Sequence, residues 1–302
     1  HYFGWYAQTV EQIDIWLDSF HEKNPDIKLC ISEYGAEGMT NLHSAEPVQG
    51  DYTEEYQAYF HEHYIKALTE RKWLWGSYVW NMFDFGSAIR NEGGVRGRNN
   101  KGLVTFDRKT KKDAFYVYKA NWSDEKFVHI AGERFVDRPT GEQKIKIYSN
   151  CDKVKLTVND ETVELEGDKI FVFDAVIKEG ENIITAKSGK CSHKIVINGT
   201  DIPNPDYQLP EGCESFVRNW FNSNEDINPD NLSLNDSLGD ILFNSEVQRL
   251  VKNHAGISVD HPALKVVGKL PLKPISKIAS KLGAEQPVTL ANQFLQTIKK
   301  DK

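Results

Sequence analysis

Apolar residues recur every three to four positions in parts of the first third of the chain, and short continuous apolar runs lie between those parts. The runs are at 27–31 and 74–80, and helical spacing occurs at 10–20, 56–68 and 115–119. This alternation predicts strands that follow one another through helices. Strands that are apolar on both faces predict a parallel sheet covered by helices. Because two strands cannot stabilise such a sheet, we expect most of it to lie outside this chain.

The period falls to two between about residues 127 and 198, where β-branched residues alternate with polar ones. Short turn sequences with Gly, Asn or Asp separate these segments. The pattern predicts roughly seven antiparallel strands and is typical of an immunoglobulin-like β-sandwich. The aromatic side chains of Tyr148, Phe171 and Phe173 fall at positions that we expect to face its core.

A third region begins near residue 201 with a stretch rich in Pro and Asn, which reads as a linker. Helical spacing then returns at 237–254, 264–282 and 288–300. We therefore divide the chain into an α/β region, an all-β region, and a linker with a helical C-terminal region, at residues 1–124, 125–200 and 201–302 respectively.

The composition excludes several classes of protein. The 302 residues carry 37 basic and 44 acidic side chains, a net charge of −7, and 39% of them are hydrophobic. This hydrophobic content suffices for packed cores and excludes a globally disordered chain. The acidic balance argues against nucleic acid as a partner. No apolar run approaches the length of about 18 residues that a membrane-spanning helix needs.

The four cysteines are Cys30, Cys151, Cys191 and Cys213. Their wide, irregular spacing matches neither a zinc site nor a disulfide-rich secreted module. We expect them to be reduced, with a Cys151–Cys191 bridge as the alternative, and this favours a cytoplasmic location. The chain begins at His1, inside an aromatic cluster, so a signal peptide upstream of it remains open.

Glu33 is the main candidate for chemistry. It directly follows an apolar strand, and the carboxyl end of a parallel strand is where barrel enzymes place their reactive groups. An isolated acid at such a position would be read as a surface residue. Here aromatic residues occur in the neighbouring predicted segments, at Tyr2, Trp5 and Trp80. Aromatic faces combined with a carboxylate suit a sugar ring and its hydroxyl groups.

Several motifs occur together, in order, within about the first 122 residues. They are Tyr2-Phe3-Gly4-Trp5-Tyr6, Ile31-Ser32-Glu33-Tyr34-Gly35-Ala36-Glu37, Tyr52-Thr53-Glu54-Glu55-Tyr56-Gln57, Val79-Trp80-Asn81-Met82-Phe83-Asp84-Phe85 and Asn99-Asn100-Lys101-Gly102-Leu103-Val104-Thr105-Phe106-Asp107-Arg108-Lys109. With these motifs the chain resembles the C-terminal part of glycoside hydrolase family 2 enzymes, most closely the bacterial β-galactosidases.

The resemblance implies the C-terminal part of a (β/α)8 TIM barrel, with strands seven and eight present and roughly the first six units missing. It places Glu33 on the catalytic nucleophile, Tyr2 on the tyrosine that hydrogen-bonds this nucleophile, and Trp80 on the tryptophan that walls the sugar subsite. Hydrolysis in this family retains the anomeric configuration through a covalent glycosyl-enzyme. The acid/base Glu follows an Asn at the end of strand four, a position that this chain lacks. We therefore expect the chain alone to be inactive.

Asn99 and Lys101 bear on the identity of the sugar. In the related β-glucuronidases an Asn-x-Lys at the corresponding position binds the substrate carboxylate, but many galactosidase-like relatives also have this pattern. The surrounding motifs favour hydrolysis of terminal non-reducing β-D-galactose residues. A β-glucuronidase, or a non-catalytic carbohydrate-binding or structural fragment, is the alternative. Asp84 is expected either to bond a sugar hydroxyl or to cap a turn.

We expect no cofactor and no metal ligands in this chain. Magnesium ligands of the full-length parent would lie upstream. Lys101 stands where metal-dependent β-galactosidases have an Asn that helps to bind sodium, so a sodium site is doubtful. The expected partner is a β-galactoside substrate, without nucleic acid or membrane. Residues 201–302 are expected to act as a scaffold, which leaves a homo-oligomer open.

Overall fold

The computed structural model of the chain has two compact units, His1–Cys213 and Glu214–Lys302. It describes residues 2–6, 8–87, 90, 93–210, 230–249, 292 and 294–301. The predicted boundary at 124/125 lies inside the first unit.

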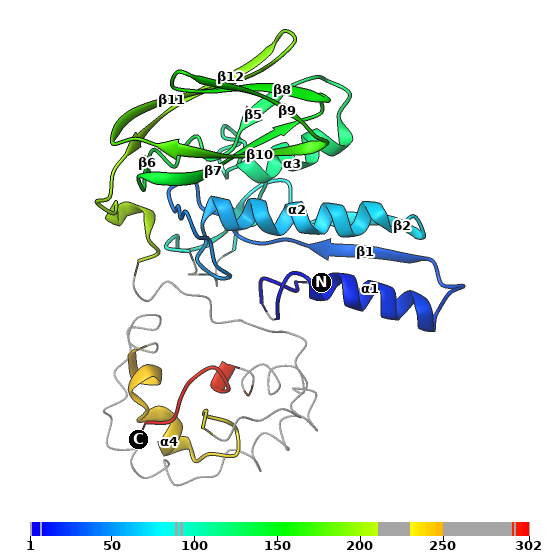
Figure 1. The fold of residues 1–302 in the computed structure, drawn as a ribbon. Coiled ribbons are helices and arrows are strands. Elements are labelled where there is room, and N and C mark those ends of the chain that lie inside the picture. Colours follow the sequence, from blue (N-terminus) through cyan, green and yellow to red (C-terminus); the bar gives the residue numbers. More distant parts are fainter. Residues whose placement is uncertain are drawn as a thin grey trace. The chain divides into compact units, whose positions relative to one another are not determined.

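The first part of this unit alternates helices and strands, as the spacing predicts. β1 and β2 are parallel neighbours with α2 between them in sequence, and α3 packs against α2 (Figure 1). The elements are α1 (Gln12–Lys23), β1 (Leu29–Tyr34), α2 (Glu54–Glu70), β2 (Leu74–Val79), the short antiparallel pair β3 (Phe85–Gly86) and β4 (Arg98–Asn99), and α3 (Asp113–Trp122).

The sequence of α2 explains both its start and its burial. Thr53 caps the helix, because its side-chain oxygen accepts a hydrogen bond from the backbone N–H of Tyr56 at 3.1 Å. Tyr56, Phe60 and Tyr64 follow at helical spacing and are all buried. These aromatic residues form the face of α2 that packs into the core of the first unit.

The strands differ from the prediction in one respect. Trp75 and Tyr78 of β2 are 64% and 60% exposed. The prediction that this strand is buried on both faces is therefore wrong for this chain. The physical reason is that β1 and β2 form a two-stranded sheet, and no described element covers these two side chains.

His61 of α2 is buried among aromatic residues, and its Nδ1 lies 2.8 Å from the Tyr118 hydroxyl. Burial, with a smaller contribution from the charge of Lys112, lowers the pKa of His61 from 6.5 to about 3. The folded chain therefore keeps this ring neutral, while the unfolded chain binds a proton below pH 6.5. The resulting stability is present above pH 6.5 and is lost as the pH falls towards 3.

Between pH 7 and pH 5, we expect the free energy of unfolding to fall by about 2 kcal/mol more in the wild type than in His61→Phe. The reason is that each pH unit below about 6.5 costs the wild type about 1.4 kcal/mol. Phenylalanine fills the site without a titrating group, and the Tyr118 hydroxyl keeps its contact with Tyr34 at 3.2 Å. Urea denaturation at the two pH values measures this difference. An equal fall in both proteins would contradict the lowered pKa that we assign to His61.

The second part of the first unit consists of two sheets that enclose one apolar core. Their strand orders are β10-β7-β5 and β6-β12-β11-β8-β9, and all pairs are antiparallel except β12 with β6. Phe171 is buried and Phe173 is partly buried against this core, which confirms their predicted orientation. Tyr148 is also buried, but it packs in the core with the helices and donates to Glu62 of α2, so the prediction that it faces the sandwich core is wrong. The strands are β5 (Val128–Ile130), β6 (Asp137–Arg138), β7 (Gly141–Ser149), β8 (Lys153–Val158), β9 (Glu161–Glu166), β10 (Lys169–Ile177), β11 (Gly180–Ser188) and β12 (Cys191–Gly199).

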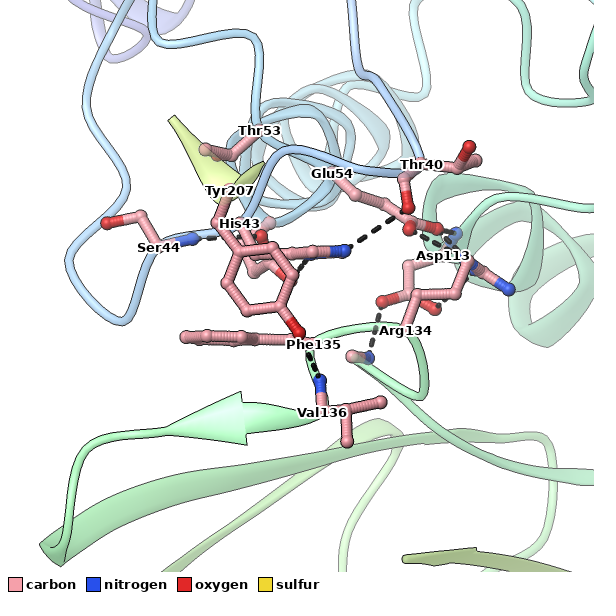
Figure 2. A network of polar contacts seen from close by, with 12 residues as sticks. Thr40, His43, Ser44, Thr53, Glu54, Asp113, Arg134, Phe135, Val136 and Tyr207 are labelled. Carbon is pink, nitrogen blue, oxygen red and sulfur yellow. Dashed lines mark hydrogen bonds and ion pairs between the residues drawn. The ribbon is translucent and has the colours of Figure 1, made fainter. Parts of the chain in front are cut away.

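A buried polar network joins the sandwich to the helices (Figure 2). Arg134, in the loop between β5 and β6, donates from Nε to Glu54 Oε2 at 2.8 Å. Glu54 also accepts from the backbone N–H of Asp113 at 2.7 Å, and His129 Nε2 lies 2.8 Å from Asp113 Oδ1. Glu54, Asp113 and His129 are all buried. The N-termini of α2 and α3 are therefore tied to the sandwich through Arg134 and His129.

In the described part of the second unit, the structure shows less helix than the spacing predicts. Helix α4 (Leu238–Leu242) begins with a capping box between Ser237 and Asp240. The predicted helix 237–254 is interrupted after α4, where the Asn244 side chain accepts from the backbone N–H groups of residues 246 and 247. Of the predicted helix 288–300, residues 296–300 form turns and a bridge instead. The predicted helix 264–282 lies outside the described residues.

The described part of the second unit has a small apolar core of its own. The thiols of Cys30, Cys151 and Cys191 are free, as expected, and Cys213 is outside the described residues. Among the helices that the structure describes, none combines the length and the apolar character that crossing a membrane requires.

Candidate active site at the strand ends

Three segments that are distant in sequence meet at the carboxyl ends of β1 and β2. The backbone N–H of Trp80 donates to Tyr34 O at 2.8 Å, and that of Asn81 donates to Lys101 O at 3.2 Å. The N–H of Gly38 donates to Asn100 O at 3.1 Å. These bonds connect the segments that carry Glu33, Trp80, Asn99 and Lys101.

Two glycines allow this close approach. A Cβ atom on Gly35 would lie 2.0 Å from the Trp80 carbonyl oxygen, and one on Gly102 would lie 2.0 Å from the Asp84 backbone nitrogen. Any side chain at either position would therefore push the segments apart. The position of Trp80 beside the end of β1 thus depends on Gly35.

The N-terminal segment supplies Tyr2. Its hydroxyl donates a hydrogen bond to Glu33 Oε1. Burial and the Glu33 carboxylate both raise the pKa of Tyr2, so the hydroxyl keeps its proton and acts as a donor. Hydrogen bonds to backbone carbonyls hold this segment on the rest of the unit, from Tyr64 to Phe3 O at 3.0 Å and from Gln49 to Trp5 O at 3.0 Å.

Lys101 is almost fully buried, at 1% exposure. Its ammonium group donates to the Tyr6 hydroxyl at 2.6 Å and to Glu37 Oε1 at 3.1 Å. The same nitrogen lies 4.7 Å from the ring centre of Tyr6, and 5.7 Å from those of Tyr2 and Trp5. A cation is therefore placed within an aromatic cluster that also contains the tyrosine bonded to Glu33.

Glu37 is the counter-charge of Lys101. It is 0% exposed and also accepts a hydrogen bond from Arg90. Burial opposes its ionisation, but the charges of Lys101 and Arg90, with a hydrogen bond from the backbone N–H of Asn100, hold the pKa of Glu37 below its usual value. Glu37 is therefore a carboxylate in the folded protein.

Asn99 and Asp84 have local structural partners. The buried Asn99 side chain accepts from the backbone N–H of Lys101 at 3.0 Å. Asp84 accepts from Lys112 Nζ at 2.8 Å and from the backbone N–H of Gly102 at 2.9 Å. Burial raises the pKa of Asp84, although Lys112 opposes this. These contacts favour the turn-stabilising role for Asp84, and its contact with a sugar stays a prediction.

Trp80 is the most accessible of the predicted site residues. Its side chain is 38% exposed and packs edge-on against Phe85, with 5.6 Å between the ring centres. An exposed indole face beside a carboxylate is available to a sugar ring. Tyr6 and Arg90 are partners of this site that the sequence did not single out. No local signal identifies them, because the need for partners follows from the burial of Lys101, which only the fold shows.

A second cluster has the residue types of a metal site. The ligand atoms of His129, Glu133 and His193 lie within 4.8 Å of one another. However, His193 Nδ1 accepts a hydrogen bond from the backbone N–H of Ile130 at 2.9 Å, so the ring proton is on Nε2, which lies 3.2 Å from Glu133. A metal would have to displace this proton. The cluster is therefore explained as a chain of hydrogen bonds.

A cavity of about 240 Å³ lies between the loop at residues 43–45, the edge of the sandwich and the segment 200–208. Its walls include the rings of Phe135 and Tyr207, and the Tyr207 hydroxyl accepts from the backbone N–H of Val136 at 3.1 Å (Figure 2). None of its lining residues is a lysine or an arginine, and none is a predicted site residue. This cavity therefore does not suit an anionic sugar.

Known proteins resemble the chain in both sequence and fold, although no protein-family model matches it. A β-glucuronidase from Bacteroides fragilis is 39% identical over 196 residues, which are 61% of this chain and 28% of that protein. The structure of an FMN-binding β-glucuronidase from Facaelibacterium prausnitzii L2-6 is 49% identical, with a TM-score of 0.68 over 70% of this chain and 33% of that one. The chain is similar to glycoside hydrolases.

Two further structures agree with this similarity. A Bacteroides fragilis protein described provisionally as a β-galactosidase is 34% identical, with a TM-score of 0.62 over 66% of this chain and 32% of that one. Bacteroides uniformis β-glucuronidase 2, covalently bound to cyclophellitol-6-carboxylate aziridine, is 30% identical, with a TM-score of 0.60 over 67% of this chain and 26% of that one. The chain thus spans about a third or less of these glycoside hydrolases.

The comparisons support the resemblance to glycoside hydrolase family 2 at the level of the family. They support a resemblance to β-glucuronidases better than the predicted closer resemblance to β-galactosidases, because most of these relatives are β-glucuronidases. The alternative that the sequence left second is therefore the better supported one.

Proposed function

We propose that the whole protein containing this chain is a retaining exo-β-glycosidase that prefers β-glucuronides. The observation that carries this proposal is that Tyr2 contacts both Glu33, through its hydroxyl, and the Lys101 ammonium, through its ring. The candidate nucleophile and the buried cation therefore contact the same tyrosine. The pairing suits a sugar with its anomeric carbon at the carboxylate and a carboxylate of its own at the ammonium.

In the proposed reaction a Glu33 oxygen attacks the anomeric carbon while the bond to the leaving oxygen breaks. A second carboxylic acid, supplied from outside this chain, gives its proton to that oxygen and later takes one from the attacking water. Tyr2 orients the Glu33 carboxylate by donating to one of its oxygens. Trp80 offers its exposed indole to the apolar face of the sugar.

Lys101 is proposed to bind the substrate carboxylate, together with Asn99. An ammonium has three donors, and among the described residues Lys101 uses two of them, on Tyr6 and Glu37. The third is available for a carboxylate oxygen, which gives a charge-assisted hydrogen bond. The relative that is bound covalently to a carboxylate-bearing ligand supports a substrate with a carboxylate of its own.

We expect Lys101→Met to lower kcat/KM for a chromogenic β-glucuronide by about 100-fold in the whole protein, because a charged group bonded to the substrate carboxylate is lost. The value for the matching β-galactoside should change only about two- to threefold. Lys169→Met on β10 is the control, because Lys169 carries no predicted role. Equal losses on the two substrates would contradict a role in carboxylate binding.

A β-galactosidase is the second candidate, favoured by the Bacteroides fragilis relative described in that way. The same pair of substrates tests it in the wild-type protein. A higher kcat/KM for the β-galactoside than for the β-glucuronide would decide for this candidate and against the first.

A further inference from the structure

Glu37 has contacts that the proposed reaction does not explain. It lies four residues after Glu33, in the loop that follows β1, and it is completely buried. Its Oε1 atom accepts from Lys101 Nζ at 3.1 Å and from Arg90, and its Oε2 atom accepts from the backbone N–H of Asn100 at 3.1 Å. A single buried carboxylate therefore holds two cations.

Lys101 depends on this carboxylate for its charge. A buried ammonium without a counter-charge is costly, and such a group tends to lose its proton. The other groups in contact with Lys101 are the Tyr6 hydroxyl and the rings of Tyr2, Trp5 and Tyr6, which are uncharged at neutral pH. Among the residues that the structure describes, Glu37 is the acid that forms an ion pair with Lys101.

The other charged groups around Glu37 are positive or already paired. Arg90 shares the Oε1 atom with Lys101. Lys112, at the start of α3, interacts with the charge of Glu37 but is paired with Asp84 at 2.8 Å. Without the Glu37 charge, Lys101 would be a buried amine that has lost its ion-pair partner among the described residues, and burial disfavours the charged form of such a group.

We propose that Glu37 is a positioning residue, which keeps Lys101 charged and in place and thereby sets the preference of the site for β-glucuronides over neutral β-galactosides. This inference rests on the proposed function. Glu37 acts through Lys101 and does not touch the sugar. A neutral substrate does not need the ammonium, so its hydrolysis is independent of Glu37.

Glu37→Gln in the whole protein tests this inference, because glutamine has the same shape without the charge. We expect KM for a chromogenic β-glucuronide to rise about 10- to 100-fold at pH 8 and less at pH 6, because burial without a counter-charge disfavours the charged form of the lysine most at the higher pH. The KM for the β-galactoside and both kcat values should stay within about threefold of the wild type. Glu37→Asp keeps the charge on a shorter side chain, so it should raise KM for the glucuronide less than Glu37→Gln does, and equally at both pH values.

Two results would overturn the inference. One is a wild-type KM for the glucuronide in Glu37→Gln at both pH values. The other is an equal rise for both substrates without pH dependence, which indicates a purely structural role. If Glu37→Gln does not fold, Glu37→Asp carries the test and must raise KM for the glucuronide alone. If Lys101→Met lowers kcat/KM for the glucuronide more than for the galactoside, but neither Glu37 variant raises KM for the glucuronide alone, only this inference fails. If Lys101→Met affects both substrates equally, the proposed function fails.

Discussion

Glu33→Gln should abolish glycoside hydrolysis by the whole protein, with kcat lowered by about 10⁴-fold or more. The amide keeps the size of the side chain and its hydrogen bond to Tyr2, but it cannot form the ester to the anomeric carbon. The loss should be the same for β-glucuronides and β-galactosides, because the nucleophile is common to both. Initial rates with both chromogenic substrates measure it.

Glu46→Gln is the matched control for this variant, because Glu46 is an exposed acid in the loop between β1 and α2. It should keep the wild-type rate. Thermal melting should show that Glu33→Gln remains folded, since Glu33 is only partly buried. Full activity in folded Glu33→Gln would refute the assignment of the nucleophile, whatever the preferred sugar.

Arg134→Met should produce the largest loss of stability, about 3–5 kcal/mol, which corresponds to a fall in Tm of roughly 6–20 °C. Arg134 is bonded to Glu54, which is completely buried at the N-terminus of α2. Removal of the arginine leaves that acid and the neighbouring Asp113 without this cation. Thermal and urea denaturation measure the effect.

The effect of Arg134→Met should depend on pH. Burial and the charge of Asp113 raise the pKa of Glu54, and Arg134 opposes this rise. An acid whose pKa is raised in the folded state loses stability as the pH rises through that pKa. Without Arg134 the pKa of Glu54 rises further, so the deficit of the variant should be larger at pH 8 than at pH 5.

Lys144→Met provides the control for Arg134→Met. Lys144 forms an ion pair with Asp174 at 2.8 Å on the sandwich, and their side chains are 73% and 64% exposed. An exposed pair of this kind contributes about 0–1 kcal/mol. A similar loss in both variants, or a deficit in Arg134→Met that does not change with pH, would contradict the role given to the buried network.

The sequence by itself determined the order of helices and strands in the first region, the two-sheet region, and Glu33 as a candidate nucleophile. The physical reason is that periodicity is local: the burial of Tyr56, Phe60 and Tyr64 follows from their spacing on one helix. The prediction was less successful in the described part of the second unit, where the Asn244 side chain interrupts a helical pattern by accepting from the backbone N–H groups of residues 246 and 247.

Only the tertiary structure decided which groups surround the site and hold the two layers together. Lys101 bonds Tyr6, 95 residues away, and Arg134 bonds Glu54, 80 residues away. The lysine was visible in the sequence as a candidate ligand, but its dependence on Glu37 was not. Burial makes each of these charges costly unless a partner lies within hydrogen-bond distance. Such partners come from segments that meet only when the chain folds, and no local pattern specifies them.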